Sequence, residues 1–224
     1  MSTQILSHYE IVSGMPEDTV VTFHGVSWEE YEELLQQVGE AAGLRISYGD
    51  GTLQVMTLSS GHENYVRFIE NLINTIRLRL RMNIRSFGSM TMRKQPEKRG
   101  NEPDACFYIQ TASKIGKKIQ LNFETDPPPD VALEVDVHHD TLWKDSIYAA
   151  LGVPELWRFD GRTFTIRVLR EKQYVEVPQS RALPVLTAQT LTDFLTRLCD
   201  EGELETILAF DRWLQSQRQA RPQG

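Results

Sequence analysis

The chain has 224 residues, of which 40% are hydrophobic, and it carries a formal net charge of −7 at neutral pH. This length suits one domain with a substantial core, and the apolar runs are far shorter than the roughly 20 residues that cross a bilayer. Residues 1–10 lack a signal-peptide pattern, and Cys106 and Cys199 stand far apart, so we expect a cytoplasmic protein without membrane contact, disulfide framework or thiolate metal site.

A helix and a hairpin are expected first along the chain. Ser27 and Glu30 form a capping box, which predicts a helix that runs to about Glu40. Residues 44–48 and 53–57 alternate apolar and polar side chains around a Gly-Asp-Gly turn, which is the pattern of a β-hairpin.

A long core helix is expected over residues 62–80, where apolar residues recur with the spacing of a buried stripe. His62 falls on that stripe in the first turn, so its side chain should point inward. The sequence leaves two interpretations of His62 open: a core or capping residue, or a residue with a functional role.

Basic residues gather in the middle of the chain. Residues 67–118 contain 12 Lys and Arg against 4 Asp and Glu, a net +8, whereas the rest of the chain carries −15. Phosphate contacts depend on local Lys and Arg density, so this stretch favours nucleic-acid binding; a solvated helix face followed by a flexible loop is the alternative. Residues 93–100 are predicted to form a polar loop near a substrate. Its candidate nucleic-acid-binding residues are Arg93, Lys94, Lys98 and Arg99.

Strands and helices follow in the second half. Residues 104–110 are expected to form one strand, and residues 130–137 another that is mostly apolar, as in a strand covered on both faces. Asp140 or Thr141 can cap a helix that ends near Leu151. Further elements are expected as strands at 156–159, 164–169 and 173–177 and as an amphipathic helix at 191–217.

The sequence shows no internal repeat and no linker to a second domain. We therefore expect a single domain over residues 21–217, preceded by an N-terminal extension at 1–20 and followed by a flexible tail at 218–224.

Acidic residues interrupt the apolar strand. Glu134 and Asp136 are two residues apart, so their side chains share one face and their Cα atoms lie about 7 Å apart. Buried carboxylates are costly without compensation, which a hard ion such as Mg²⁺ would supply; a solvated strand end or an internal ion pair is the alternative. Asp104 opens the preceding strand and could meet Glu134 across a neighbouring pair. We favour Asp104 with Glu134 as the metal-binding acids.

Lys144 adds a positive charge to the same region. It shares the stripe of its expected helix with Ile147, Tyr148 and Leu151, which indicates an ammonium that faces the site. Beside two metal-bound carboxylates, such a lysine would hold a scissile phosphate and orient or help deprotonate the attacking water. The alternative is a lysine that snorkels from the helix flank or pairs with Asp140.

The order of these motifs resembles that of a known family. GHE opens the long helix, and EPDACFYI, PPPDVALEV, a D-x3-K-x3-Y pattern and GVPELWRFD follow it. This order resembles the Uma2 family (DUF820) of restriction-endonuclease-like proteins, within the PD-(D/E)xK nuclease-like superfamily. The resemblance extends roughly from Val20 to Trp213 and is most specific between Pro129 and Asp160.

The resemblance implies an α/β (α+β) restriction-endonuclease-like fold. A mixed central β-sheet would be flanked by helices, with a helix and a hairpin at the N-terminus and a helix at the C-terminus. Asp104 and Glu134 would bind the metal, and Lys144 would be a lysine moved from the strand onto the following helix.

The resemblance also concerns three supporting residues. The superfamily's usual strand lysine would stand at position 136, where this chain has Asp136, so activity would rest on Lys144. His62 matches a histidine at the start of the long helix, and Tyr148 matches a tyrosine that follows the lysine.

Three functions compete at this point. The first is a Mg²⁺-dependent DNA endonuclease, with Mn²⁺ as a substitute metal, whose catalytic residues are Asp104, Glu134 and Lys144. The second is a nucleic-acid-binding or interaction protein that keeps the fold but has lost its chemistry, which Asp136 favours. The third is a phosphoesterase for small molecules, which needs a closed pocket. The sequence leaves the oligomeric state open, although a homodimer would let two sites cut both DNA strands.

Overall fold

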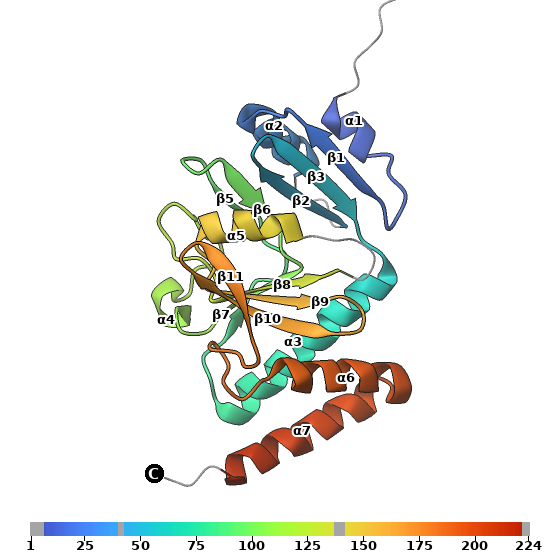
Figure 1. Cartoon of the computed structure of the whole chain (residues 1–224), viewed down its shortest axis with the longest axis vertical. Coiled ribbons are helices and arrows are strands. Elements are labelled where there is room, and N and C mark those ends of the chain that lie inside the picture. The colour runs from blue at the N-terminus through green and yellow to red at the C-terminus, as the bar shows by residue number, and fades with distance from the viewer. Residues whose placement is uncertain (1–6, 40–42, 137–141, 221–224) are drawn as a thin grey trace, which may run out of the picture.

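The computed structural model describes residues 7–39, 43–136 and 142–220, and within these the strands form two sheets (Figure 1). The first sheet has five strands, and each neighbouring pair is antiparallel. In spatial order its strands are β1 (Val20–His24), β3 (Thr52–Thr57), β2 (Leu44–Gly49), β6 (Arg99–Asn101) and β5 (Met92–Lys94). The predicted hairpin is thus the centre of this sheet.

The second sheet has six strands within the described ranges and is mixed. In spatial order its strands are β11 (Gln173–Val177), β10 (Phe164–Arg170), β9 (Glu155–Phe159), β8 (Val131–Val135), β7 (Ala105–Tyr108) and β4 (Arg85–Ser86). β8 runs parallel to β9 and antiparallel to β7. No residue of β8 is more than 1% exposed, so the predicted mixed sheet and its doubly covered strand are confirmed.

Helices cover both faces of this second sheet. The described helices are α1 (His8–Val12), α2 (Trp28–Val38), α3 (Ser60–Leu80), α4 (Ala112–Ile115), α5 (Asp145–Leu151), α6 (Ala188–Glu201) and α7 (Glu203–Ala220), with a 3₁₀ turn at Leu142–Lys144. Of these, α1 and α2 pack instead on the first sheet, in one core cluster with residues of β2 and β3. Val131, Leu133 and Val135 of β8 belong to the core cluster that contains the apolar residues of α3, α6 and α7. Ala132 belongs instead to the cluster that contains Ile147 of α5. Successive side chains of β8 point to opposite faces of the sheet, so α3 packs on one face and α5 on the other.

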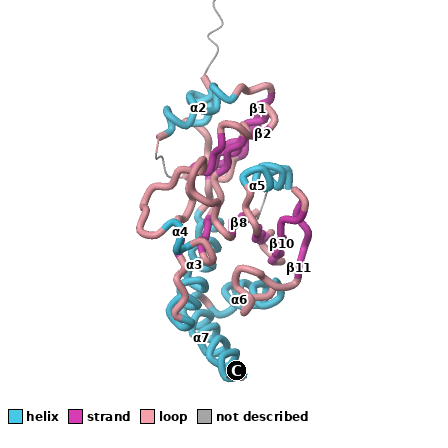
Figure 2. Tube along the Cα trace, turned by 90° about the vertical axis from the view of Figure 1, so that its left-hand side faces the viewer, coloured by secondary structure: helices cyan, strands magenta, loops and turns pink. Residues whose placement is uncertain are grey.

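α5 lies between the two sheets. It contacts β2, β5 and β6 of the first sheet and β11 of the second. Figure 2 shows the same position from the side, with α5 between β2 and the strands β10 and β11. The buried side chains of α5 and of its preceding turn are thus held between the two sheets.

Two expected elements are wrong in detail. Residues 93–100 are not a loop, because β5 and β6 pair there as a tight hairpin whose turn includes Lys98 with φ of 46°. The expected helix at 191–217 is two helices, since the chain turns at Gly202, where φ is 83°. A positive φ suits glycine and ends a regular helix.

No helix in the described ranges combines the length and the apolar character that a bilayer crossing requires. The expected domain boundaries near residues 20 and 217 stay predictions. Asp140 and Thr141, the expected helix caps, lie outside the described residues.

Candidate active site

The two predicted acids face each other across the β7–β8 pair. Ala105 pairs with Leu133, and the Asp104 amide donates to the Leu133 carbonyl at 3.0 Å, so Asp104 stands opposite Glu134. Residues opposite each other in an antiparallel pair have Cβ atoms about 4.5–5.5 Å apart. Asp104 is 2% exposed and Glu134 is 1% exposed. The structure thus brings two carboxylates together inside the protein.

Asp104 is held by three donors. Arg45 Nε donates to Oδ1 at 3.1 Å, His62 Nε2 lies 3.1 Å from Oδ2, and the Val135 amide donates to Oδ2 at 2.8 Å. Burial alone would raise the pKa of Asp104, but the hydrogen bond and charge of His62, together with Arg45 and the Val135 amide, outweigh it and lower the pKa. The carboxyl group is therefore held in its ionised form.

His62 points inward from the first turn of α3, as the sequence predicts, and is 8% exposed. Burial acts to lower its pKa, but the hydrogen bond and the charge of Asp104 raise it on balance. His62 therefore has a specific polar partner beyond its place in the core.

Glu134 is held by a second set of donors. Lys144 Nζ donates to Oε2 at 3.1 Å, and the Tyr148 hydroxyl and Asn101 Nδ2, the latter at 3.2 Å, both donate to Oε1. Asn101 Nδ2 also donates to the Tyr148 hydroxyl at 2.5 Å. Burial, with the charge of Glu134, raises the pKa of Tyr148 well above its usual range, so the phenol stays protonated and able to donate.

Lys144 comes from the 3₁₀ turn that precedes α5 and is 1% exposed. Its ammonium is the cation of a buried ion pair with Glu134. Ile147, Tyr148 and Leu151 are buried beside it, so the predicted inward stripe is present.

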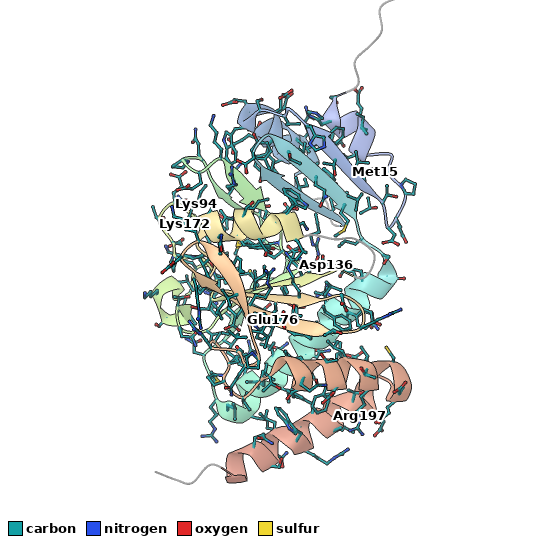
Figure 3. All side chains as sticks on the ribbon, in the orientation of Figure 1. Met15, Lys94, Asp136, Lys172, Glu176 and Arg197 are labelled. Carbon is teal, nitrogen blue, oxygen red and sulfur yellow. The ribbon has the colours of Figure 1, made fainter. Side chains whose placement is uncertain are left out.

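Asp136 stands just beyond β8 and pairs with a different cation. Arg158 Nη1 donates to Asp136 Oδ2 at 2.6 Å, while Nη2 donates to Asp145 at 2.9 Å (Figure 3 labels Asp136). Arg158 also stands opposite Glu134 in the β8–β9 register. The internal ion pair that the sequence left open is therefore present at Asp136.

The predicted nucleic-acid-binding residues lie on the β5–β6 hairpin, whose second strand also contains Asn101. Arg93 pairs with Glu32 at 2.6 Å, Lys94 Nζ donates to the Leu151 carbonyl at 3.0 Å, and Arg99 pairs with Asp50 at 2.5 Å. Lys98, at the turn, is exposed.

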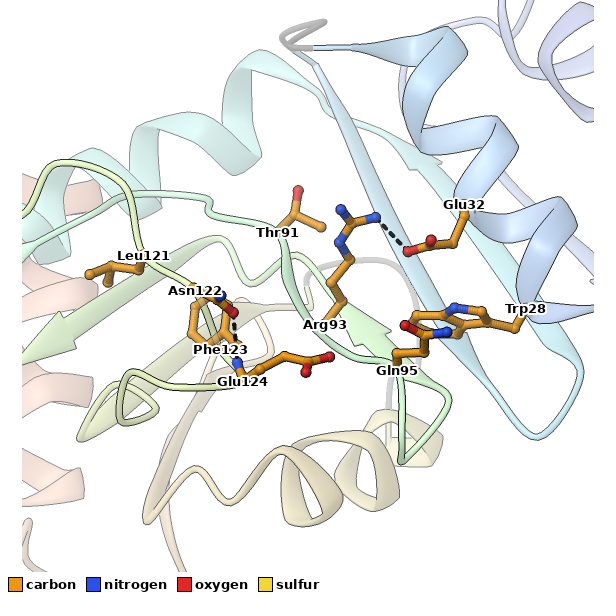
Figure 4. Close-up of a pocket in the computed structure, with 9 residues that line it drawn as sticks. All are labelled: Trp28, Glu32, Thr91, Arg93, Gln95, Leu121, Asn122, Phe123 and Glu124. Carbon is orange, nitrogen blue, oxygen red and sulfur yellow. Dashed lines mark hydrogen bonds and ion pairs between the residues drawn. The ribbon is translucent and has the colours of Figure 1, made fainter.

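Arg93 and Glu32 line a pocket of about 400 Å³ between α2, β5 and the segment 121–124 (Figure 4). Its other polar side chains include Thr91, Gln95 and Asn122. None of the three predicted catalytic residues lines this pocket.

Sequence analysis missed two donors of the site, Arg45 and Asn101. Arg45 occupies a polar position of the predicted hairpin, and Asn101 follows the segment that was expected to be a loop. Both come from the first sheet, so only its packing against the second sheet brings them to the acids. Local sequence patterns carry no signal for such a contact.

The donor set is suited to a hard divalent cation. A carboxylate offers about four acceptor positions, and Asp104 and Glu134 each accept three hydrogen bonds from described residues. Each acid therefore keeps an oxygen position for a cation such as Mg²⁺, which prefers oxygen ligands. The described residues contain no group of three His, Cys, Asp or Glu side chains arranged for a metal, so neutral oxygens would have to complete the coordination.

The mixed sheet between helices is the fold that the sequence analysis expects of a restriction-endonuclease-like protein, and two of its strands bring the predicted acids and lysine together. The family model Uma2, described as "Putative restriction endonuclease", matches residues 28–198. The chain therefore belongs to the Uma2 family, as its motifs predicted.

The solved structures that match the chain include a putative nuclease belonging to DUF820 from Anabaena variabilis ATCC 29413. The identity is 16% and the TM-score 0.48, over 76% of this chain and 99% of that chain. No functionally curated protein matches the chain.

Proposed function

We propose that this protein is a Mg²⁺-dependent endonuclease that hydrolyses phosphodiester bonds of DNA, with Mn²⁺ as a substitute metal. The family described as restriction endonucleases supports this class of reaction. The observation that carries the proposal is the buried pair of Lys144 and Glu134, with Asp104 opposite Glu134. It provides the two acids and the lysine that such a site needs, although Asp136 occupies the usual lysine position.

Asp104 and Glu134 would hold the cation through their remaining oxygen positions. A bound divalent cation lowers the pKa of a coordinated water and stabilises negative charge on phosphate. Lys144 Nζ has three N–H donors, of which one goes to Glu134. The others would contact a non-bridging phosphate oxygen and orient the attacking water. The attacking water would form a bond to phosphorus and give up one proton to solvent, while the bond to the leaving oxygen breaks and that oxygen takes up a proton from solvent.

Binding of DNA is proposed for the β5–β6 hairpin. Lys98 is exposed and can contact a phosphate directly, whereas Arg93, Lys94 and Arg99 would exchange an internal partner for a phosphate. A homodimer would bring a second site to the other strand.

The test is cleavage of plasmid and single-stranded DNA with Mg²⁺, Mn²⁺ or EDTA. We expect metal-dependent cleavage by the wild type and a loss of at least about a hundredfold in Asp104→Ala, Glu134→Ala and Lys144→Gln. Lys172→Gln, at an exposed lysine, is the matched control for the charge change. Full cleavage by the three folded site variants would show that the site lies elsewhere.

The alternative function is a nucleic-acid-binding or interaction protein without chemistry. Its support is the burial of the site: Asp104, Glu134 and Lys144 are 2%, 1% and 1% exposed and already paired. A substrate phosphate would reach Lys144 only after the surrounding chain moved. If the wild type binds DNA with a strong salt dependence but cleaves no substrate, the binding function is supported over the endonuclease.

A further inference from the structure

Two buried oxygen atoms near the acids have no hydrogen-bond partner in the part of the chain that the structure describes. They are Oδ1 of Asn101, which is 0% exposed, and Oγ of Ser47, which is 1% exposed. A buried polar atom without a partner loses the free energy of its hydration, so such atoms usually indicate a water or ion that belongs at the site.

Strand pairing places both atoms on the face that contacts the acids. Ser47 of β2 stands directly opposite Asn101 of β6, so their side chains share a face. Arg45, two residues before Ser47, is on that same face and reaches Asp104 at 3.1 Å. Asn101 itself reaches Glu134 at 3.2 Å. The two oxygens therefore lie on the face of the first sheet whose neighbouring contacts reach Asp104 and Glu134.

The orientation of the Asn101 amide follows from its partners. Nδ2 donates both to the Glu134 carboxylate and to the Tyr148 hydroxyl. The reverse orientation would set Oδ1 against the negatively charged oxygen of Glu134, which repels it. Oδ1 is thus the atom that is left for another ligand.

We propose that Asn101 Oδ1 and Ser47 Oγ are further ligands of the divalent cation held by Asp104 and Glu134. This inference rests on the proposed function and extends its site to the first sheet. Neutral amide and hydroxyl oxygens suit a hard cation, and they complete its coordination without adding negative charge. A buried water that bridges the two atoms is the competing occupant.

The test is Mn²⁺ binding by the full chain without DNA, measured by isothermal titration calorimetry. The midpoint temperature of thermal unfolding, measured without metal, reports on folding. Ser47→Ala removes a hydroxyl that makes no hydrogen bond to any described residue, so the midpoint of thermal unfolding should stay or rise while Mn²⁺ affinity falls severalfold. Asn101→Ala should weaken Mn²⁺ binding about tenfold. Asn101→Asp loses the same Nδ2 hydrogen bonds but keeps an oxygen, so it should bind Mn²⁺ at least as well as the wild type.

Ser180→Ala is the matched control, because the Ser180 side chain is buried and donates to Glu155 at 2.6 Å. It should lower the midpoint and leave Mn²⁺ affinity unchanged. If Ser47→Ala and Asn101→Ala bind Mn²⁺ like the wild type while an Asp104→Ala variant that still unfolds cooperatively does not, the two oxygens are not ligands, but the proposed metal site stands. A wild type that binds no Mn²⁺ overturns both.

Discussion

The negative charge of each buried acid of the site is balanced by a positively charged side chain from another element. Asp104 is paired with Arg45 of β2 and His62 of α3, while Glu134 is paired with Lys144 before α5. Isolated buried charges would cost far more than a folded domain can sustain, so these pairs are conditions of folding as well as parts of a site.

The His62–Asp104 pair predicts a pH dependence of stability. The pKa of His62 is raised above its ordinary 6.5, so its contribution is complete below pH 6.5 and is lost as the pH rises through the folded pKa. The pKa of Asp104 is lowered from 3.8, so its contribution is complete above that pH and is lost in stronger acid. The pair is therefore most stabilising between these two ordinary values.

His62→Gln keeps a neutral donor but removes the titration. We expect the wild type to exceed this variant in free energy of unfolding by more at about pH 6 than at about pH 9. Urea denaturation at the two pH values measures the difference. A difference that does not change with pH would mean that the pKa of His62 is the same in the folded and unfolded protein, which would contradict the prediction.

The acids and the lysine could be predicted because charges in an apolar strand and on an inward helical stripe stand out in the sequence. The helical stripes also predicted that His62 and Tyr148 point inward, and the family resemblance added that both support the site. Arg45 and Asn101 could not be predicted, because their roles depend on how one sheet packs against another and not on their neighbours in the chain.

Among the helices and strands, those with a strong periodic pattern of apolar residues were predicted correctly. α3 and the hairpin at the centre of the first sheet lie where the sequence places them. The β5–β6 hairpin was missed, since its Pro, Gly and charged residues are typical of a loop. It becomes a hairpin because β6 completes its hydrogen bonds against β2.

The β6 strand also contains a close contact that is specific to glycine. A Cβ on Gly100 would lie 2.0 Å from the hydroxyl oxygen of Tyr31, a buried residue of α2. Gly100→Ala must therefore displace Tyr31, and we expect a loss of about 1–3 kcal/mol in free energy of unfolding. Urea denaturation measures this loss.

Gly61→Ala is the control, because a Cβ there meets nothing within 4 Å. Gly61 lies in the first turn of α3, where alanine should be neutral or stabilising by about 0.4–1 kcal/mol. If Gly100→Ala were as stable as Gly61→Ala, α2 would not pack rigidly on β6.

At the scale of the whole molecule, the charge is negative but unevenly distributed. The total is −7, whereas residues 67–118 carry +8. Binding of DNA would therefore depend on a local surface, and it should weaken steeply as salt rises. The β5–β6 hairpin belongs to this basic stretch.

Lys98→Gln tests that surface. We expect the slope of log affinity against log salt to become shallower by about 1, the value for one lost phosphate contact. Lys172→Gln is a close control, because Lys172 is also exposed and also has a positive φ, of 72° against 46° for Lys98. Equal slopes for the two variants would place the DNA on another face.

In the proposed endonuclease, one acid of the site lies where the chain passes between the two sheets, so it contributes to folding as well as to the proposed chemistry. β6 ends at Asn101 and β7 begins at Ala105, so the chain crosses from one sheet to the other through Asp104 itself. Removing one member of such a buried pair costs about 3–5 kcal/mol, so a descendant that no longer cuts would still keep Asp104 and Glu134 in order to fold. Ser47, whose hydroxyl has no partner among the described residues, is not required for folding in this way. Under the proposed function, its replacement in a descendant would weaken metal binding at no cost in stability, so it should change before either acid does.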